Sequence, residues 1–434
     1  MKKMIIIGGG TAGTMMLNKL HRKLKKEWEF TIIDKDENHY YQPGYLFIPF
    51  GIYKPEDVVK KKKDFYPKGT RFKVDEVLRV EPENNAVLLS RGETLYYDVL
   101  IIATGTQPVP EETPGLKDKL WYKDIFDFYT HEGASALAKK LETWEGGRLV
   151  INLAESIIKC PIAPLEFAFL ADSYFTKKGM RDKVEITYTT PLPGAFTKPI
   201  ATKMLSGLMA EKNITVIPDF YVEHVDNEEK KLVSYDAKEV PFDLLVSVPV
   251  NMGSEMVENS NMGDEDDLGF IPTDKHTLQS RDHENIFVIG DATNLPTSKA
   301  GSVAHFEGEI LEENILSYVR GEELEAKFDG HANCFIETGF GKATLIDFNY
   351  DHEPYPGKYP FAGVGPMGLL EVNRANHWGK LLFEWVYWHM MLTGKKIPVS
   401  HHYSLKGKKV PEKANGAVIK AEPELVEEKV MSQQ

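Results

Sequence analysis

The chain has 434 residues, of which 42% are apolar, so it is long enough for two or three domains with substantial cores. Its formal net charge of -13, from 52 basic and 65 acidic residues, argues against nucleic acid as a partner, because a phosphate-binding surface normally leaves a basic excess. The start, MKKMIIIGGG, breaks into glycines after a short apolar run, unlike a secretory signal, and no stretch of about 18 apolar residues predicts a spanning helix. We therefore expect any membrane contact to be made from one side.

The N-terminal region predicts a dinucleotide-binding unit. A β-branched run is followed by Gly8, Gly10 and Gly13 in the G-x-G-x-x-G spacing, then by a helix-like stretch and a second strand that ends at Asp34. Glycines here let the backbone approach a pyrophosphate, the helix N-terminus presents unpaired N–H groups, and the acid binds ribose hydroxyls. A structural glycine turn is the alternative, but strand, helix and acid in this order favour nucleotide binding.

Two later strands, in residues 96–115 and 285–296, end in turns that point to a particular dinucleotide. The residues at these turns are Thr104 and Gly105 in the first, and Gly290 and Asp291 in the second. Both segments resemble the motifs of flavoproteins with two dinucleotide-binding domains. The resemblance implies FAD as the cofactor and places Asp291 near its ribityl and pyrophosphate groups. The alternative is that both segments are only strand-ending turns.

Residues 146–179 have the outline of a second dinucleotide unit, with an apolar strand, a connection and a helix. Aligning Glu166 with the acid that commonly follows the second glycine loop places Lys159, Pro161 and Pro164 at the three glycine positions. Side chains at these positions block the approach of backbone to a pyrophosphate, and proline has no N–H to donate. We therefore expect that this domain has lost nicotinamide nucleotide binding and carries a cysteine instead.

The chain has two cysteines, Cys160 and Cys334. A rare free cysteine is by default a small buried apolar residue. Cys160 is predicted at the start of the helix that would face the flavin, where the helix N-terminus lowers the pKa of a thiol and favours the reactive thiolate. Cys334 begins a strand-like segment that follows the flavin domain, so the two cysteines could meet over the cofactor. No cysteine or histidine cluster has the spacing of metal ligands, so we expect no metal site.

The chain resembles the sulfide:quinone oxidoreductases over nearly its whole length before residue 404. The resemblance rests on the segments KCPIAPLEFAFLADSYFTKKGMRDK, NIFVIGDATNLPTSKAG, ANCFIETGFGKATLIDFNY and LLFEWVYWHMMLTG, and it is greatest to the branch that includes the mitochondrial enzyme. It implies that sulfide attacks a disulfide or polysulfide bridge between Cys160 and Cys334, and that two electrons pass through FAD to a quinone. Many bacterial members have a third cysteine, which this chain lacks, so FAD is expected to be bound without a covalent link.

Two further residues receive weaker assignments. The resemblance implies that Lys299 lies beside the flavin, where a fixed positive charge stabilises the anionic reduced ring, and an exposed lysine at a helix start is the alternative. Glu166 is expected either to relay protons near the flavin or to be a structural carboxylate of its helix. His131, His305 and His377 are assigned no function.

Residues 377–396 indicate contact with a membrane. A helix here would be apolar nearly all round, apart from one polar strip, and its apolar part is too short to span a bilayer. Tryptophan and tyrosine flanked by lysines are typical of an interfacial helix, and a core helix is the alternative. We expect Phe383, Trp385 and Trp388 to contact the membrane and to frame the entry of the quinone.

The sequence thus predicts an α/β fold with two Rossmann-like domains, like the disulfide reductases linked to FAD and NAD(P), and a C-terminal membrane-associating region. The predicted parts are an FAD-binding domain at 1–110 and 269–325, a second Rossmann-like domain at 111–268, a quinone and membrane region at 326–403, and a flexible tail at 404–434. Two other functions stay open: a type II NADH:quinone dehydrogenase, disfavoured by the lost glycine loop, and a catalytically silent flavin-binding protein, which would not need the cysteines. The quinone type, the sulfur acceptor, the membrane side and a homo-oligomeric state are left open.

Overall fold

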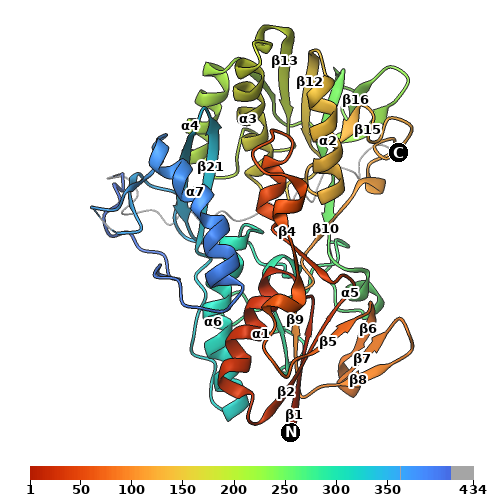
Figure 1. Ribbon diagram of the computed structural model, residues 1–434, viewed down its shortest axis with the longest axis vertical. Helices are drawn as coiled ribbons and strands as arrows, with labels where there is room; N and C mark the ends of the chain where they lie inside the picture. Colours follow the sequence, from red (N-terminus) through yellow and green to blue (C-terminus); the bar gives the residue numbers. More distant parts are fainter. Residues whose placement is uncertain (362, 412–434) are drawn as a thin grey trace, which may run out of the picture.

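Two parallel sheets lie at opposite ends of the long axis of the molecule (Figure 1). The structure is a computed structural model and describes residues 1–361 and 363–411. The first sheet has the strand order β20-β9-β1-β2-β5, with parallel pairing throughout. Its strands are β1 (Lys2–Ile7), β2 (Trp28–Asp34), β5 (Arg71–Val74), β9 (Val99–Ile102) and β20 (Ile286–Val288). The sheet thus joins the start of the chain to the segment after residue 285, as the FAD-binding motifs require.

The second sheet repeats this architecture, with the strand order β11-β18-β12-β13-β14 and parallel pairing. Its strands are β11 (Ile125–Phe126), β12 (Gly147–Leu153), β13 (Val184–Thr189), β14 (Ile214–Ile217) and β18 (Leu244–Val248). Parallel strands are covered on both faces and therefore consist of nearly continuous apolar residues, as β9 and β18 do. The predicted α/β fold with two dinucleotide-binding units is confirmed.

Each sheet is covered by helices that follow its strands along the chain. They are α1 (Thr11–Leu24) and α6 (Gly301–Arg320) at the first sheet, and α2 (His131–Thr143), α3 (Ala163–Lys177) and α4 (Pro199–Glu211) at the second, with the short α5 (Glu255–Asn259) near β6. Two glycines where β1 meets α1 are required by close packing: Gly8, after the strand, and Gly13, in the first turn of the helix. A Cβ atom on Gly13 would lie 1.8 Å from the Gly8 carbonyl oxygen, and one on Gly8 would lie 2.3 Å from the carbonyl oxygen of Ala103.

Both units contain a three-stranded antiparallel meander, which precedes β9 in the first unit and β18 in the second. The meanders are β6 (Val77–Glu81), β7 (Ala86–Leu89) and β8 (Thr94–Tyr96) in the first unit, and β15 (Val222–Asp226), β16 (Lys231–Ser234) and β17 (Glu239–Pro241) in the second. Two short antiparallel pairs complete this part of the chain: β3 (Asn38–Tyr40) with β4 (Val59–Lys61), and β10 (Gln107–Val109) with β19 (Val250–Met252). The β10–β19 pair fixes the connection between the two units.

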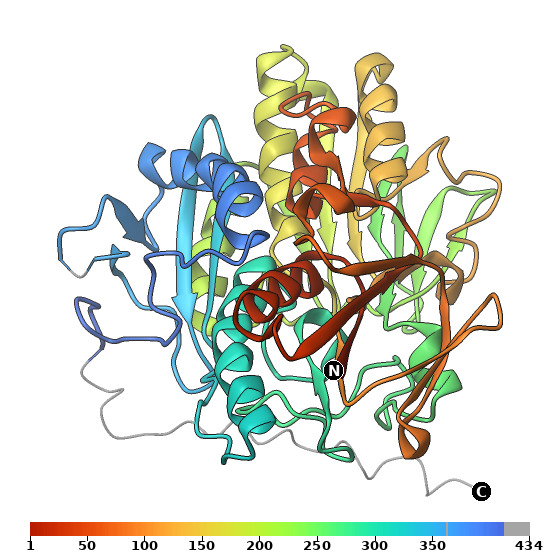
Figure 2. The same cartoon turned by 60° about the horizontal axis from the view of Figure 1, so that its bottom comes forward.

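The C-terminal region forms a third sheet, of order β21-β22-β24-β23, and one long helix. Its elements are β21 (Ala332–Gly339), β22 (Lys342–Phe348), β23 (Gly357–Tyr359), β24 (Met367–Leu369), α7 (Arg374–Val386) and a π-helical turn, Tyr387–Met391. Figure 2 shows this sheet and α7, in blue, on one side of the molecule beside α3 and α6. The strand β21 therefore brings C-terminal residues against the start of α3.

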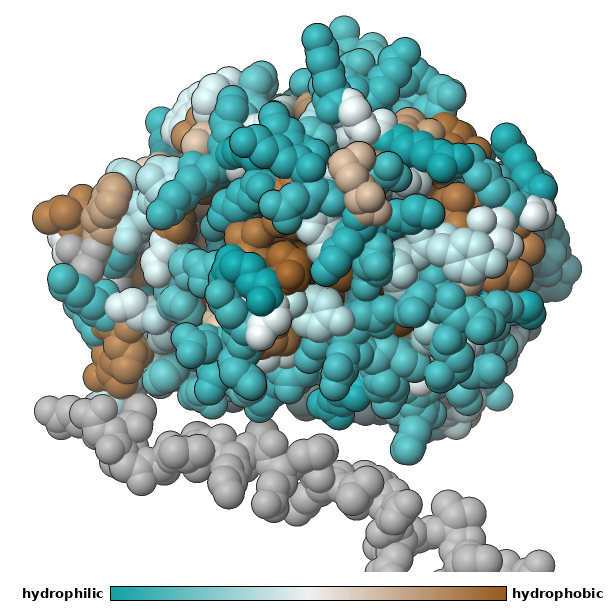
Figure 3. Space-filling view, turned by 90° about the horizontal axis from the view of Figure 1, so that it is seen from below, coloured by the Kyte–Doolittle hydropathy of each residue, from teal (hydrophilic) through white to brown (hydrophobic). Residues whose placement is uncertain are grey.

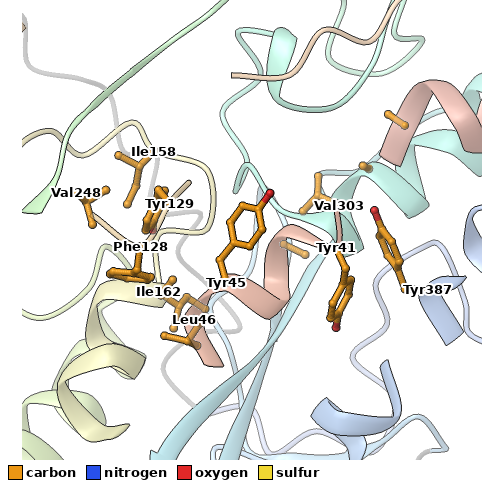
Figure 4. Close-up of a cluster of buried hydrophobic side chains, with 14 of the residues drawn as sticks. Tyr41, Tyr45, Leu46, Phe128, Tyr129, Ile158, Ile162, Val248, Val303 and Tyr387 are labelled. Atoms are coloured by element: carbon orange, nitrogen blue, oxygen red, sulfur yellow. The ribbon is translucent and has the colours of Figure 1, made fainter. Parts of the chain in front are cut away.

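One hydrophobic core links all three regions. In Figure 4, Tyr387 from the C-terminal turn lies beside Tyr41, and Tyr45 and Leu46 continue the cluster towards Phe128 of the second unit. The Tyr41 and Tyr387 ring centroids are 4.8 Å apart. Since this core is continuous, the site between the regions is held by rigid surroundings.

Two expectations about the C-terminal region need correction. The tail does not begin at residue 404, because the side chain of Lys408 is only 4% exposed and forms an ion pair with Asp347; residues 412–434 lie outside the described part of the chain. Trp388 does not face outward: it is only 3% exposed, stacks on Phe65 and packs against His39. Within the described residues, no helix has both the length and the apolar character needed to cross a bilayer.

Candidate active site

A cavity of about 380 Å³ lies at the carboxyl ends of β1, β9 and β20. This edge of a parallel sheet is where α/β proteins bind nucleotides. The residues of the predicted FAD motifs that line the cavity are Gly8, Gly10, Asp34, Thr104, Gly105, Gly290 and Asp291. Gly13 does not line it, because Gly13 packs against the carbonyl of Gly8, where α1 contacts the glycine turn.

Three helices begin at the cavity wall: α1, α3 and α6. None of their N-cap residues, Gly10, Ile162 and Ala300, makes a side-chain capping hydrogen bond. The first N–H groups of a helix have no partner within the helix, and this end of the helix dipole is positive. The cavity is therefore suited to an anionic ligand such as a pyrophosphate.

The lining fits a dinucleotide such as FAD. A Cβ atom added to Gly10, Gly105 or Gly301 would meet no protein atom within 4 Å, so at these positions the backbone borders open space that a ligand can approach closely. The hydroxyls of Thr104 and Thr106 are buried at this wall without a partner among the described residues. Buried polar groups of this kind are normally hydrogen-bonded, and a bound ligand would provide the partners.

Asp34 is held in place at the end of β2. Its Oδ2 accepts a hydrogen bond of 2.6 Å from the Gly9 N–H, and its Oδ1 lies 2.6 Å from Lys62 Nζ. Lys62 also lines the cavity and is buried, although it belongs to a run of four lysines that is typical of a solvated surface. Only the tertiary structure identifies this lysine as part of the site.

Cys160 lies in the connection between β12 and α3, three residues before the helix begins at Ala163, and not in the helix as expected. Its backbone has a positive φ of 82°. The Cys160 N–H donates to the Lys299 carbonyl at 2.7 Å, and its own carbonyl accepts from the Ala163 N–H at 2.8 Å and the Tyr129 hydroxyl at 3.0 Å. These bonds fix the loop against the first unit and direct Cys160 to the cavity, which it lines.

Cys334 is on β21, which packs against α3, and Cys160 is in the loop before that helix. Burial raises the pKa of Cys160 to about 11; Glu166 raises it further and Lys380 opposes this. Burial also raises the pKa of Cys334 well above its usual range, and Cys160 adds to the increase. The expectation of a lowered pKa at Cys160 is therefore wrong for this state, because burial outweighs the helix end.

Glu166 and Lys380 form a buried ion pair beside the cysteines, at the cavity wall. Glu166 Oε1 also accepts a 2.7 Å hydrogen bond from the Glu337 N–H, and Lys380 Nζ donates to the Phe335 carbonyl at 3.1 Å. Burial raises the pKa of Glu166, and Lys380 opposes the increase. Burial by itself would lower the pKa of Lys380, but Glu166 and Glu337 keep it above its usual value. Because the pair links α7, α3 and β21, it was not predictable from spacing.

Lys299 is buried at the cavity and not exposed. Its Nζ donates to the carbonyls of Asp291 at 2.9 Å and Thr293 at 2.7 Å, and it lies 3.7 Å from the centre of the Phe270 ring. Burial lowers the pKa of Lys299 to about 8, and Asp291 opposes the decrease. Lys299 thus holds the turn that presents Asp291 to the cavity.

Tyr387 is a site residue that the sequence did not single out. Its hydroxyl lies 2.7 Å from Thr11 Oγ1, in the first turn of α1, and 2.7 Å from His39 Nε2, and the residue lines the cavity. Burial lowers the pKa of His39 to about 3, so its ring stays neutral at physiological pH. The C-terminal turn therefore forms one wall of the nucleotide site.

Helix α7 has an apolar outer face. Trp378, Leu382 and Trp385 are spaced four and three residues apart, so they share one face, and they are 66%, 56% and 53% exposed. Phe383 is half-buried and contacts Tyr41. By contrast, the face seen from below is mostly hydrophilic, with hydrophobic residues in small groups (Figure 3).

The fold and the cavity together define a dinucleotide-binding protein with two Rossmann-like units. The model of the family "Pyridine nucleotide-disulphide oxidoreductase" matches residues 2–308, and the chain belongs to this family, whose members are FAD-dependent flavoproteins. The chain is 29% identical to the mitochondrial sulfide:quinone oxidoreductase of Dictyostelium discoideum over 91% of this chain and 86% of that protein. It is 26% identical to the mouse enzyme of the same name, over 90% and 86%.

Two other similarities bear on the site. The crystal structure of the sulfide:quinone oxidoreductase from Aquifex aeolicus has a TM-score of 0.75 at 21% identity, covering 91% of this chain and 92% of that one. A type II NADH:quinone oxidoreductase of Staphylococcus aureus is 25% identical over 75% of this chain and 84% of that protein. The first of these similarities shows a shared fold, and the second identifies a distant relative with a different electron donor in its name.

Proposed function

We propose that this chain is a sulfide:quinone oxidoreductase that uses FAD. The observation that carries the proposal is the placement of Cys160 at the wall of the nucleotide cavity, in the loop before α3, while Cys334 lies on β21, the strand that packs against α3. A pair of half-buried thiols, one of them at the wall of the nucleotide cavity, suits two-electron sulfur chemistry. The similarity to two mitochondrial sulfide:quinone oxidoreductases, over 91% and 90% of this chain, supports the same substrates.

The two cysteines act as a bridge that opens and closes. Sulfide attacks one sulfur of the Cys160–Cys334 bridge, which leaves a persulfide on the attacked cysteine and a thiolate on the other. An acceptor nucleophile then removes the sulfane sulfur, and the bridge re-forms as the two electrons leave the sulfur atoms. FAD, when bound, accepts these two electrons and passes them to a quinone.

The residues around the cysteines stabilise this chemistry. A thiol with a raised pKa is a poor nucleophile at neutral pH, so the oxidised bridge and not a free thiolate is the form that meets sulfide. The ammonium of Lys380 opposes the raised pKa of Cys160 and stabilises a thiolate when the bridge opens. Glu166 can take up or release a proton beside the same sulfur.

In the second unit, within the predicted domain 111–268, the loop that carries Cys160 takes the position of a nucleotide-binding turn. Lys159, Pro161 and Pro164 occupy the glycine positions of a nucleotide turn, and Lys159 forms a β-bridge with Lys299 of the first unit. A loop tied to the flavin site in this way offers no open backbone to a second pyrophosphate. We therefore propose that NADH is not an electron donor for this protein. In this respect it would differ from the Staphylococcus aureus relative, whose name includes NADH.

We further propose that α7 binds the membrane from one side and lies at the quinone entry. On this helix the exposed face carries Trp378, Leu382 and Trp385, while His377 and Lys380 turn towards the protein. An apolar outer face with tryptophans is typical of an interfacial helix.

Anaerobic mixing of the oxidised holoenzyme with sulfide or with NADH tests the proposed reaction. We expect sulfide to bleach the flavin absorption band within the mixing experiment, and a quinone to restore it. Bleaching by NADH alone would assign the chain to the NADH dehydrogenases, and no bleaching by either donor would leave a catalytically silent flavoprotein. The proposal holds only for the first result.

A further inference from the structure

A histidine and a glutamate form an inward-facing pair where α7 packs against β21. His377 Nδ1 lies 2.8 Å and 3.0 Å from the two carboxylate oxygens of Glu337. The Glu337 side chain is 1% exposed, whereas that of His377 is 18% exposed, at the rim of the helix beside the exposed Trp378. His377 is therefore the member of the pair that reaches solvent.

The pair continues inward to the cavity. The Glu337 N–H donates to Glu166, which is ion-paired with Lys380, and the charge of Lys380 opposes the increase in the pKa of Glu337 that burial causes. Glu166 lines the cavity. The residues His377, Glu337, Lys380 and Glu166 thus form a row of ionisable side chains from the surface to the nucleotide site. The other titratable side chains that face this row are Cys160, Cys334, Tyr41, Tyr53 and Glu384.

The proposed reaction needs a proton from outside. Oxidation of HS⁻ to bound sulfane sulfur releases two electrons and one proton. Reduction of a quinone to its quinol consumes two electrons and two protons. One turnover therefore takes up one proton, and a quinone that enters from lipid beside an apolar helix brings no water to provide it. The protein must supply a route from solvent.

We propose that His377 and Glu337 are the entry for this proton and pass it through Lys380 and Glu166 to the quinone; the proposal rests on the proposed function. Imidazole exchanges protons readily near neutral pH, and a carboxylate within hydrogen-bonding distance accepts them. Burial raises the pKa of Glu337, which makes this carboxylate more ready to hold a proton than an exposed one. The alternative is that the pair only fastens α7 to β21.

The test is the rate at which chemically reduced flavin is reoxidised by a short-chain quinone in the holoenzyme. Reducing the flavin with light or dithionite removes sulfide from the measurement, so the result does not depend on the first half of the proposed reaction. In His377→Gln we expect reoxidation to be slower by roughly 10²-fold, and free imidazole in the buffer to restore much of the rate. Glu337→Gln should be slow as well, but imidazole should not restore it. Reduction of the flavin by sulfide should be unchanged in both variants.

His389→Gln is the matched control, since His389 is exposed and follows α7 in the π-helical turn, where its Nδ1 contacts only the Trp385 carbonyl within the described residues. This variant should behave like the wild type. Normal reoxidation in His377→Gln, or a loss that imidazole does not restore, would overturn the proton-entry proposal. Failure of sulfide to reduce the wild-type flavin would instead overturn the proposed function, because the reoxidation assay does not use sulfide.

Discussion

The hydroxyl of Tyr387 lies 2.7 Å from Thr11 Oγ1, so a residue of the C-terminal turn is bonded to the first turn of the helix that begins the nucleotide site. The same hydroxyl lies 2.7 Å from His39 Nε2. The C-terminal segment therefore has two different faces: its outer face is apolar, and its inner face completes the cavity.

Tyr387→Phe is predicted to weaken FAD binding. Loss of one hydroxyl leaves Thr11 and His39 without a buried partner, which costs roughly 1–3 kcal/mol, or roughly 5-fold to 150-fold in the dissociation constant. The quantity to measure is the quenching of flavin fluorescence as the apoprotein is titrated. Tyr96→Phe, at an exposed position of β8, should leave the affinity unchanged. If Tyr387→Phe and Tyr96→Phe bind FAD with equal affinity, the contact of Tyr387 with Thr11 and His39 is not part of the flavin site.

FAD is predicted to be released without a thioether link, because the two cysteines are assigned to the sulfur bridge and the chain has no third one. After denaturation in acid, the flavin should appear in the supernatant and have the mass of unmodified FAD. Flavin that remains with the precipitated polypeptide would contradict this prediction.

Cys160→Ser and Cys334→Ser are each predicted to abolish reduction of quinone by sulfide, because neither variant can re-form the bridge. FAD should stay bound in both, since neither cysteine belongs to the glycine turn or to the Asp291 turn. Turnover with sulfide and the flavin content of the purified protein are the two measurements. Near-normal turnover in either variant would remove that cysteine from the mechanism.

Replacing Trp378, Leu382 and Trp385 with serine is predicted to release the protein from lipid vesicles without unfolding it. These side chains are exposed, and burying each in a membrane would contribute up to roughly 1.5–3 kcal/mol. Use of long-tailed quinones should decrease more than use of short, water-soluble ones. Flotation with vesicles and the melting temperature are the measurements.

Trp388→Ser provides the contrast to these three positions. Because Trp388 is buried against Phe65 and His39, this change should destabilise the fold by roughly 3–5 kcal/mol. A Trp388 variant that is as stable as the wild type, but no longer binds vesicles, would reverse our assignment of the two faces.

The stability of the protein is predicted to decrease in acid partly because of His39. Burial lowers its pKa from 6.5 to about 3, so the unfolded chain takes up a proton at a higher pH than the folded chain does. The free energy of unfolding should therefore be unaffected above pH 6.5 and should fall as the pH decreases from there towards about 3. In His39→Gln this decrease should be smaller, as measured by urea unfolding at several pH values. In His389→Gln it should match the wild type.

The sequence by itself predicted the α/β fold and the nucleotide cavity. The glycine turn, Asp34 and the strand ends at Thr104 and Asp291 were identifiable because each depends on a short segment: a strand, a turn without side chains and a helix start. The sequence also predicts, from Lys159, Pro161 and Pro164 at the glycine positions of the second turn, that nucleotide binding is lost there. Backbone geometry of this kind is local, so residues close in the chain determine it.

Only the tertiary structure decided what surrounds the reactive groups. Burial raises the pKa of Cys160, whereas its position before a helix indicated a lower pKa. Trp388 is buried, whereas the residues around it in the sequence indicated that it faces a membrane. The Glu337–His377 and Thr11–Tyr387 contacts join segments that no spacing rule relates. The physical reason is the same in each case: desolvation and hydrogen bonding depend on which distant elements pack together, and that packing is a property of the whole fold.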